Sequence, residues 1–156
     1  MTTDPLYAKP GHLIRRCQQI AVALFMEEAG ADGFDVTPVQ YAALAAIGEH
    51  PGIEAAALAA RIAYDRSTLG DVIERLVGKR LVARAPDARD RRLKRLSLTA
   101  EGARLLAAIE PAVARAQARI LAPLAPADRA RFLALLAQLV DINNAHSRAP
   151  RRVPAG

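Results

Sequence analysis

Apolar residues recur three and four positions apart over most of the chain, which is the spacing of one face of an α-helix. The first run predicts a helix over 12–28, whose shared face holds Leu13, Cys17, Ile20 and Leu24. Thr37-Pro38 is a helix start, with a capping hydroxyl before a proline at the first helical position. Other helices are predicted from there to Pro51, over 53–62, from a cap at Asp65 or Ser67 to Gly78, from Thr99 onwards and from Pro126 onwards.

The helical pattern breaks between residues 81 and 98. Leu81-Val82-Ala83 reads as a short strand, an arginine-rich turn covers 85–92, and 93–98 reads as a returning strand in which side chains alternate between two faces. Helix, strand, basic turn, strand and helix is the outline of a winged helix. We therefore predict a mainly α-helical fold: a winged helix-turn-helix with a two-stranded β-wing, flanked by N- and C-terminal dimerisation helices.

The predicted organisation has four parts: an N-terminal arm and dimerisation helix (1–34), the winged helix-turn-helix domain (35–102), C-terminal dimerisation helices (103–146) and a disordered tail (147–156). A small winged helix cannot by itself cover the apolar stripes of the outer helices. Packing against a second copy would bury them, so we expect a homodimer. The tail holds three arginines and two prolines, a composition typical of disorder.

Charge is concentrated in the predicted wing. The chain of 156 residues has a formal net charge of +6. Residues 79–95 alone hold eight basic side chains (Lys79, Arg80, Arg84, Arg89, Arg91, Arg92, Lys94, Arg95) against two acids (Asp87, Asp90). This local excess of six equals the charge of the whole chain, so the rest is neutral in sum. A basic hairpin beside a helix predicts an anionic partner such as nucleic acid.

Several other classes lack their signatures in the sequence. A single cysteine excludes an internal disulfide and fits a reducing compartment. No signal core and no membrane-spanning apolar run is present, which predicts a cytoplasmic protein with no membrane partner. No His/Cys/Asp/Glu cluster has metal-ligand spacing, and no nucleophile–base pair or phosphate-binding glycine loop is found. We therefore expect neither a cofactor nor an enzyme.

The middle of the chain resembles the winged helix-turn-helix of the MarR family of bacterial transcription regulators. The matching motifs run in order from residue 37 to 102: Thr37-Pro38-x-Gln40-Tyr41, Leu58-Ala59-x-x-Ile62, Asp65-x-Ser67-Thr68-Leu69 with Leu76, Gly78-x-x-Leu81-Val82-x-Arg84, Asp87-x-x-Asp90-Arg91-Arg92 and Leu98-Thr99-x-x-Gly102. The outer helices match in length and character. The resemblance implies a homodimer on a pseudo-palindromic operator in double-stranded DNA, with helix 66–78 in the major groove and the wing in the adjoining minor groove.

The chemistry of the residues favours DNA binding independently. Hydroxyls and free amides at a helix N-terminus meet phosphates or base edges, arginine pairs bidentately with guanine, and a narrow minor groove attracts arginine. Glycine allows close approach. The predicted DNA-binding residues are Arg66, Ser67, Thr68, Gly70, Arg75, Arg89 and Arg91. The alternative is that these arginines form an ordinary solvated face.

Three further residues are expected to position the wing. Asp90 and Arg92 match a structural pair of the family, and by that resemblance Arg92 would bridge to Asp65 and hold the wing against the recognition helix. On its sequence context alone, Asp65 is a plain helix cap. The cap and the bridge are compatible with each other.

A small aromatic acid is the expected effector, since many members of the family release DNA when such a compound enters a cleft between the dimer helices and the winged domain. The candidate ligand-binding residues are His12, Arg15, Arg16 and Tyr41, because an anionic ring needs a guanidinium for its carboxylate and aromatic or apolar faces for its ring. The run from Pro10 to Gln19 is similar to MarR-type regulators of nicotinate breakdown, which would make the effector a pyridine carboxylate such as a hydroxynicotinate. The alternative is that these side chains are simply solvated.

Two rival functions remain open. Peroxide-sensing members of the family carry a cysteine on the first helix, so a redox-sensing repressor acting through Cys17 is one alternative. Cys17 lies within the apolar stripe, however, and we expect it to be buried and inert. The other alternative, from a different class, is a protein-interaction module whose winged helix no longer binds DNA.

Overall fold

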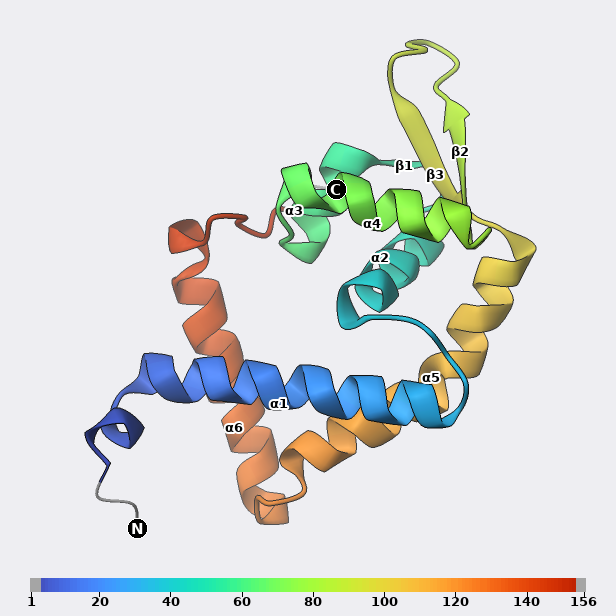
Figure 1. Ribbon diagram of the computed structural model, residues 1–156. Helices are drawn as coiled ribbons and strands as arrows, with labels where there is room; N and C mark the ends of the chain where they lie inside the picture. Colours follow the sequence, from blue (N-terminus) through green and yellow to red (C-terminus); the bar gives the residue numbers. More distant parts are fainter. Residues whose placement is uncertain (1–3, 154–156) are drawn as a thin grey trace. The chain divides into compact units, whose positions relative to one another are not determined.

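The computed structural model describes residues 4–153, and the chain is mainly helical with one small sheet (Figure 1). Its elements in order are η1 (Pro5–Ala8), α1 (Pro10–Ala31), α2 (Pro38–Glu49), β1 (Ile53–Glu54), α3 (Ala55–Ile62), α4 (Arg66–Gly78), β2 (Val82–Pro86), β3 (Lys94–Leu98), α5 (Ala100–Leu121), α6 (Pro126–Ile142) and η2 (Asn144–His146). The chain divides into two compact units, residues 4–38 with Ile109–Ala125 and Val39–Ala108 with 126–153. Within the described range, no helix is long and apolar enough to cross a membrane.

In the first unit, α1 and the second part of α5 supply most of the buried side chains, namely Phe25, Ala29, Ile109, Ala112, Val113 and Ala116. Ion pairs border this apolar contact. Arg115 donates to Glu28 (2.8 Å) and to Asp32 (2.7 Å), and Arg119 donates to Glu28 (2.8 Å). The Arg115 guanidinium, followed by that of Arg119, lowers the pKa of Glu28. Helix α1 continues beyond the predicted end at Glu28 to Ala31.

The second unit contains the helix-turn-helix. Leu44, Ile47, Leu58, Leu69, Leu76 and Leu96 are fully buried there. Between α3 and α4 the chain turns at Ala63, which takes a left-handed conformation (φ 53°) and ends α3. Lys79, just after α4, lies 3.5 Å from the buried side-chain oxygen of Gln40 and so joins the end of α4 to α2. These interactions fix α4 on a rigid apolar support.

The sheet has three antiparallel strands in the order β1-β3-β2, so the wing gains a strand beyond the two predicted. Residues 53 and 54 were expected to begin a helix, but they pair with β3, Ile53 opposite Leu96. The physical reason is the turn at Gly52, where φ is +84° and the amide donates to the Leu96 carbonyl (2.8 Å). The β2–β3 pairing runs from Val82 opposite Leu98 to Pro86 opposite Lys94, longer than predicted.

The junction between the wing and α5 is tightly built. Thr99 donates its hydroxyl to the Arg80 carbonyl (2.6 Å) and its amide to the Leu81 carbonyl (3.0 Å). The Gly102 amide in turn donates to the Thr99 hydroxyl (3.0 Å). A Cβ at Gly102 would lie 2.0 Å from the Leu81 carbonyl oxygen, so only glycine fits at this position.

The structure describes the C-terminal tail, for which disorder was predicted, as far as residue 153. The Asn144 side chain accepts from the Arg151 amide (2.8 Å) and donates to the Arg151 carbonyl (3.0 Å). The Arg152 amide donates to the carbonyl of Ala60 on α3 (2.7 Å). Residues 154–156 lie outside the described range.

Candidate nucleic-acid interface

The N-terminus of α4 is organised by Asp65. Its Oδ1 accepts from the Ser67 amide (3.0 Å) and from the Ser67 hydroxyl (2.9 Å), and the Thr68 hydroxyl donates to the Asp65 carbonyl (3.0 Å). The backbone N–H of Ser67, then its hydroxyl, lowers the pKa of Asp65. Each hydroxyl has one hydrogen, already donated to Asp65, so both oxygens are left as acceptors for an outside partner.

The two faces of α4 differ sharply. Leu69, Val72, Ile73 and Leu76 are buried against the unit's core. The opposite face exposes Arg66, Ser67, Thr68, Gly70, Asp71, Glu74 and Arg75. Among residues 4–153, apart from the neighbouring backbone of α4 itself, no atom lies within 4 Å of where a Gly70 Cβ would sit. An exposed glycine inside a helix lowers its stability relative to alanine, and no contact within the chain requires it.

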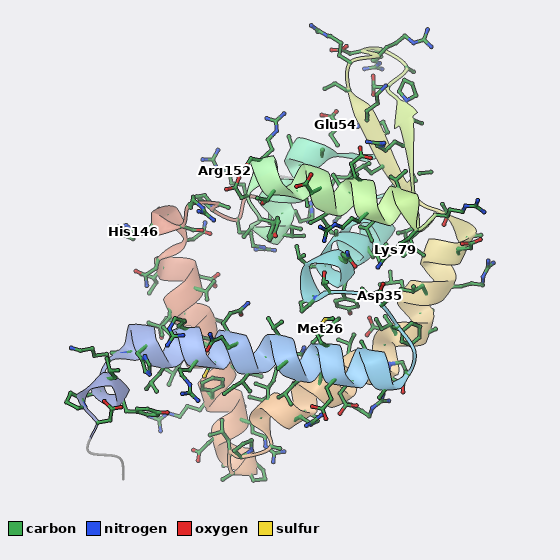
Figure 2. The ribbon with its side chains drawn as sticks, viewed as in Figure 1. Met26, Asp35, Glu54, Lys79, His146 and Arg152 are labelled. Atoms are coloured by element: carbon green, nitrogen blue, oxygen red, sulfur yellow. The ribbon has the colours of Figure 1, made fainter. Side chains whose placement is uncertain are left out.

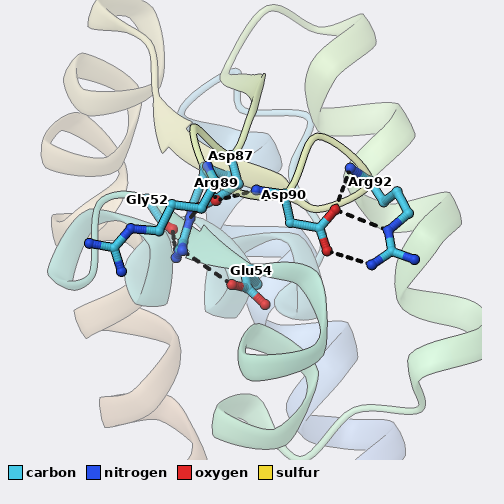
Figure 3. Close-up of polar contacts among 7 residues, drawn as sticks. Gly52, Glu54, Asp87, Arg89, Asp90 and Arg92 are labelled. Atoms are coloured by element: carbon cyan, nitrogen blue, oxygen red, sulfur yellow. Dashed lines mark hydrogen bonds and ion pairs between the residues drawn. The ribbon is translucent and has the colours of Figure 1, made fainter.

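The tip of the wing is built around Asp87. This residue belongs to one of the family motifs, but the sequence did not indicate its role. Its Oδ1 accepts from the amides of Arg89 (2.8 Å) and Asp90 (3.0 Å), and its Oδ2 accepts from Arg95 Nε (2.6 Å) (Figure 3). Only 12 % of the Asp87 side chain is exposed. The Asp90 and Arg89 amides, with the Arg95 guanidinium, lower the pKa of Asp87 to about 2.

Arg95 carries this organisation to the base of the wing. Its Nη1 donates to the Gly52 carbonyl (3.2 Å), and its Nη2 lies 3.3 Å from Glu54 Oε1 on β1 (Figure 3). One guanidinium thus ties the turn at the wing tip to the outer strand of the sheet. Nothing in the sequence distinguished Arg95 from its basic neighbours, because its partners are remote in the chain.

The expected bridge from Arg92 to Asp65 is not what the structure contains. Arg92 donates from Nε (3.0 Å) and Nη2 (2.9 Å) to Asp90, its neighbour in the turn, and Asp65 instead faces Arg148 of the tail, with Nε 3.6 Å away. The reason is local: the bent turn brings the carboxylate two residues away within reach, and Arg92 remains 89 % exposed. The wing contacts α4 through an ion pair between Arg84 and Glu74.

The four arginines that were predicted to bind DNA are accessible to an outside partner. Arg66, Arg75, Arg89 and Arg91 are exposed, and their side chains form no ion pair within residues 4–153. Carboxylates neutralise the arginines that shape the wing, while these four remain uncompensated. The arrangement is an exposed basic helix face and a basic hairpin tip on one unit, suited to polyanions.

The candidate effector residues are placed as follows. On α1, Arg15 Nη2 lies 3.4 Å from His12 Nδ1, and the His12 ring meets Tyr7 edge to face with centroids 5.6 Å apart. Arg16 is exposed on the same helix, and Tyr41 is half-buried on α2 in the other unit. Tyr7 was not among the predicted ligand-binding residues. In the sequence, its indication was an aromatic residue shortly before His12.

Cys17 is exposed, contrary to the expectation that it is buried. Its stripe neighbours Leu13 and Ile20 are 38 % and 48 % exposed, so the chain's own residues leave this face of α1 uncovered. The helical periodicity identified the face correctly but not what covers it. In the described part of the chain, no group of three His, Cys, Asp or Glu side chains is placed to hold a metal ion.

A helix-turn-helix followed by a basic β-hairpin defines a DNA-binding protein of the winged-helix class. Residues 34–93 match the model of the MarR family. The chain is 32% identical to the transcriptional repressor NicR of Pseudomonas putida over 84% of its length and 82% of that protein. This chain therefore belongs to the MarR family of transcription regulators, as its motifs predicted.

Solved structures agree along nearly the whole chain. The PcaV transcriptional regulator of Streptomyces coelicolor, in complex with its natural ligand, superposes with a TM-score of 0.80 at 34% identity, covering 90% of this chain and 98% of that one. BpsR of Bordetella bronchiseptica, whose DNA binding is regulated by 6-hydroxynicotinic acid, gives 0.78 at 30% identity, covering 85% and 94%. The predicted winged helix-turn-helix fold is thereby confirmed, with the third strand as its one addition.

The depressed pKa of Asp87 makes the wing tip sensitive to acid. A carboxyl whose pKa falls from 3.8 to about 2 on folding stabilises the folded tip above its unfolded pKa, and this contribution is lost as the pH falls through about 2. In an NMR titration, the Arg89 and Asp90 amide resonances should therefore shift with a midpoint near pH 2. Asp87→Ala should abolish that transition. A midpoint near the ordinary 3.8 would contradict the hydrogen-bonded carboxylate.

Proposed function

We propose that this protein is a ligand-responsive repressor that binds a pseudo-palindromic operator as a homodimer. The observation that carries the proposal is a set of exposed arginines on α4 and on the wing tip of one compact unit, which form no ion pair within residues 4–153. α4 would enter the major groove and the wing the adjoining minor groove. Support comes from NicR, a repressor, and BpsR, whose DNA binding is regulated by a small acid.

On α4, the groups differ in what they can read. Arg66 and Arg75 present guanidinium groups, which pair bidentately with guanine O6 and N7. Ser67 and Thr68 already donate their hydroxyl hydrogens within the cap, so they would accept from the amino groups of adenine or cytosine. Gly70 lies on the same exposed face, between Thr68 and Arg75 in the sequence. It would let the helix approach the bases closely.

At the wing tip, Arg89 and Arg91 would enter the minor groove. The Asp87 carboxylate fixes the turn that carries them through backbone hydrogen bonds, so the two side chains need not be ordered by contacts of their own. A narrow minor groove concentrates negative potential and attracts arginine without requiring base-specific hydrogen bonds. These two residues would therefore contribute affinity and register more than sequence choice.

Dimerisation would use the apolar outer helices. No residue of α6 is buried, and Leu133, Leu135, Leu139, Val140 and Ile142 are all at least half exposed. Burying one such side chain stabilises by about 1.5–3 kcal/mol, so an uncovered row of them favours association strongly. A second copy would cover this face and the exposed stripe of α1, and its two-fold symmetry would match a palindromic operator.

The effector would be an aromatic or pyridine carboxylate, such as a hydroxynicotinate. The Tyr7, His12 and Arg15 cluster combines ring faces with a guanidinium, the pair of features that a flat anionic ring requires. Arg16 and Tyr41 remain predicted contributors. The proteins BpsR, which responds to 6-hydroxynicotinic acid, and PcaV, which binds a natural ligand, support small-molecule control.

A redox-sensing repressor is the second candidate, because Cys17 is exposed in the single chain. It requires that the thiol stays accessible when the second copy covers the stripe of α1. In that case an oxidant, rather than a carboxylate, would release the operator. A protein-interaction module without DNA binding is distinguished from both by the response to loss of the wing arginines.

Gly70→Ala separates stability from DNA binding. Alanine is favoured over glycine in a helix by about 1 kcal/mol, which should raise the melting temperature by about 2–4 °C. If α4 approaches bases closely, the added methyl should cost about 1–3 kcal/mol of binding, a loss of about fivefold to more than a hundredfold in operator affinity. Gly30→Ala on α1, where the Cβ also meets open space, is the matched control and should leave DNA affinity unchanged. Equal affinities for both variants would argue against close approach at Gly70.

Replacing Arg89 and Arg91 together by alanine should weaken operator binding and reduce its dependence on salt. Each phosphate that is no longer neutralised lowers the slope of log affinity against log salt by about 0.9. Fluorescence anisotropy across a salt series measures this slope. The double lysine variant keeps both charges and should retain most of it. Unchanged repression in cells carrying the double alanine variant would favour the protein-interaction module.

The effector proposal predicts that 6-hydroxynicotinate raises the melting temperature and releases the operator, because a ligand that binds only the folded state stabilises it. Arg15→Gln should weaken both effects while leaving binding to DNA without ligand intact. Cys17→Ser should change neither. Release by peroxide that Cys17→Ser abolishes, with no response to any ring carboxylate, would instead establish the redox alternative.

A further inference from the structure

The C-terminal tail lies against the DNA-reading end of the winged-helix unit. Residues 147–153 contain Arg148, Arg151 and Arg152 and no acid. The amide of Arg152, a residue labelled in Figure 2, donates to the Ala60 carbonyl on α3. Arg148 Nε lies 3.6 Å from Asp65, the cap of α4. A basic segment is therefore held beside the first turn of the recognition helix.

The tail is held by its backbone, which leaves its charged groups available. The Asn144 side chain clamps both polar groups of the Arg151 backbone, and the Arg152 amide supplies the anchor to α3. The side chains of Arg151 and Arg152 are exposed and form no ion pair within residues 4–153. Arg148 is 89 % exposed, so its ion pair with Asp65 is weak and readily exchanged for another anion.

The tail does not cover the recognition helix. Arg66, Ser67 and Thr68 are all exposed with the tail in place. A hollow of about 290 Å³, lined by Tyr64, Asp65, Thr68, Ser147, Arg148 and Ala149, remains between the tail and the start of α4. An autoinhibitory strap would bury these reading residues, so their exposure favours a tail that extends the interface.

We propose that residues 147–153 form a second DNA-contacting arm, which binds backbone phosphates on the side of α4 opposite the wing. The wing contacts α4 at Glu74 and the tail contacts it at Asp65, nine residues earlier or about 14 Å along the helix axis. The two basic segments would thus bracket the reading face. Phosphates are the expected partners because exposed arginines without fixed geometry bind charge rather than base edges. The inference rests on the proposed operator binding.

The test is the triple variant Arg148→Gln, Arg151→Gln and Arg152→Gln, in the full chain. The backbone anchors persist in it, so its melting temperature should stay close to that of the original protein. Operator affinity should fall, and in each protomer the salt slope should decrease by about 0.9 for every phosphate that the tail no longer binds. Preference for the operator over an unrelated duplex should be kept. The triple lysine variant is the charge-matched control and should retain the slope.

Other results would contradict the proposal that the tail is a DNA-contacting arm. An unchanged salt slope in the glutamine variant would make the tail purely structural. Tighter operator binding by that variant would show that the tail opposes DNA instead of contacting it. If the original protein binds no duplex at low salt, the proposed repressor function fails first, and this outcome is distinct because it appears before any substitution is made.

Discussion

The junction where the wing returns to the helices constrains the rest of the DNA-binding unit. Gly102 approaches the Leu81 carbonyl so closely that a single added carbon would collide with it, and Thr99 is hydrogen-bonded to both Arg80 and Leu81. The start of β2, the end of β3 and the first turn of α5 therefore meet at one point. Because both strands start from this fixed base, the junction sets the direction of the wing independently of the contacts at its tip.

Beyond that base, the arginines divide into two groups by what their carboxylate neighbours do. Asp87 holds the turn and Arg95, Asp90 holds Arg92, and Glu74 holds Arg84, so these charges are used to shape the wing. The arginines on the exposed face of α4 and at the wing tip have no such partner. Surface ion pairs contribute little stability individually. Their larger effect here is to fix the shape of the wing, which carries the unpaired arginines at its tip.

The sequence predicted most of the fold because helical periodicity and capping are local signals. The sequence predicted a cap of α4 at Asp65 or Ser67, and the structure shows that the cap is Asp65. The third strand and the Arg95 clamp could not be predicted, because Gly52 and Glu54 lie about forty residues away from Arg95 in the chain. The predicted partner of Arg92 was wrong for a related reason. The family resemblance implied Asp65, which is remote in the chain, whereas the turn places Asp90 next to Arg92. Cys17 is exposed in the single chain, because periodicity identifies an apolar face without saying which surface covers it.

Helix α5 belongs to both compact units. It begins at the wing junction in the second unit and continues into the first. Pro111 lies just beyond the point of division, and proline removes one helical hydrogen bond. The first unit also holds His12 and Arg15, which are proposed to bind an effector, and ion pairs join its α1 to the second part of α5. Under the proposed ligand control, an effector would therefore alter DNA binding only if it favoured the α5 conformation of one functional state over that of the other.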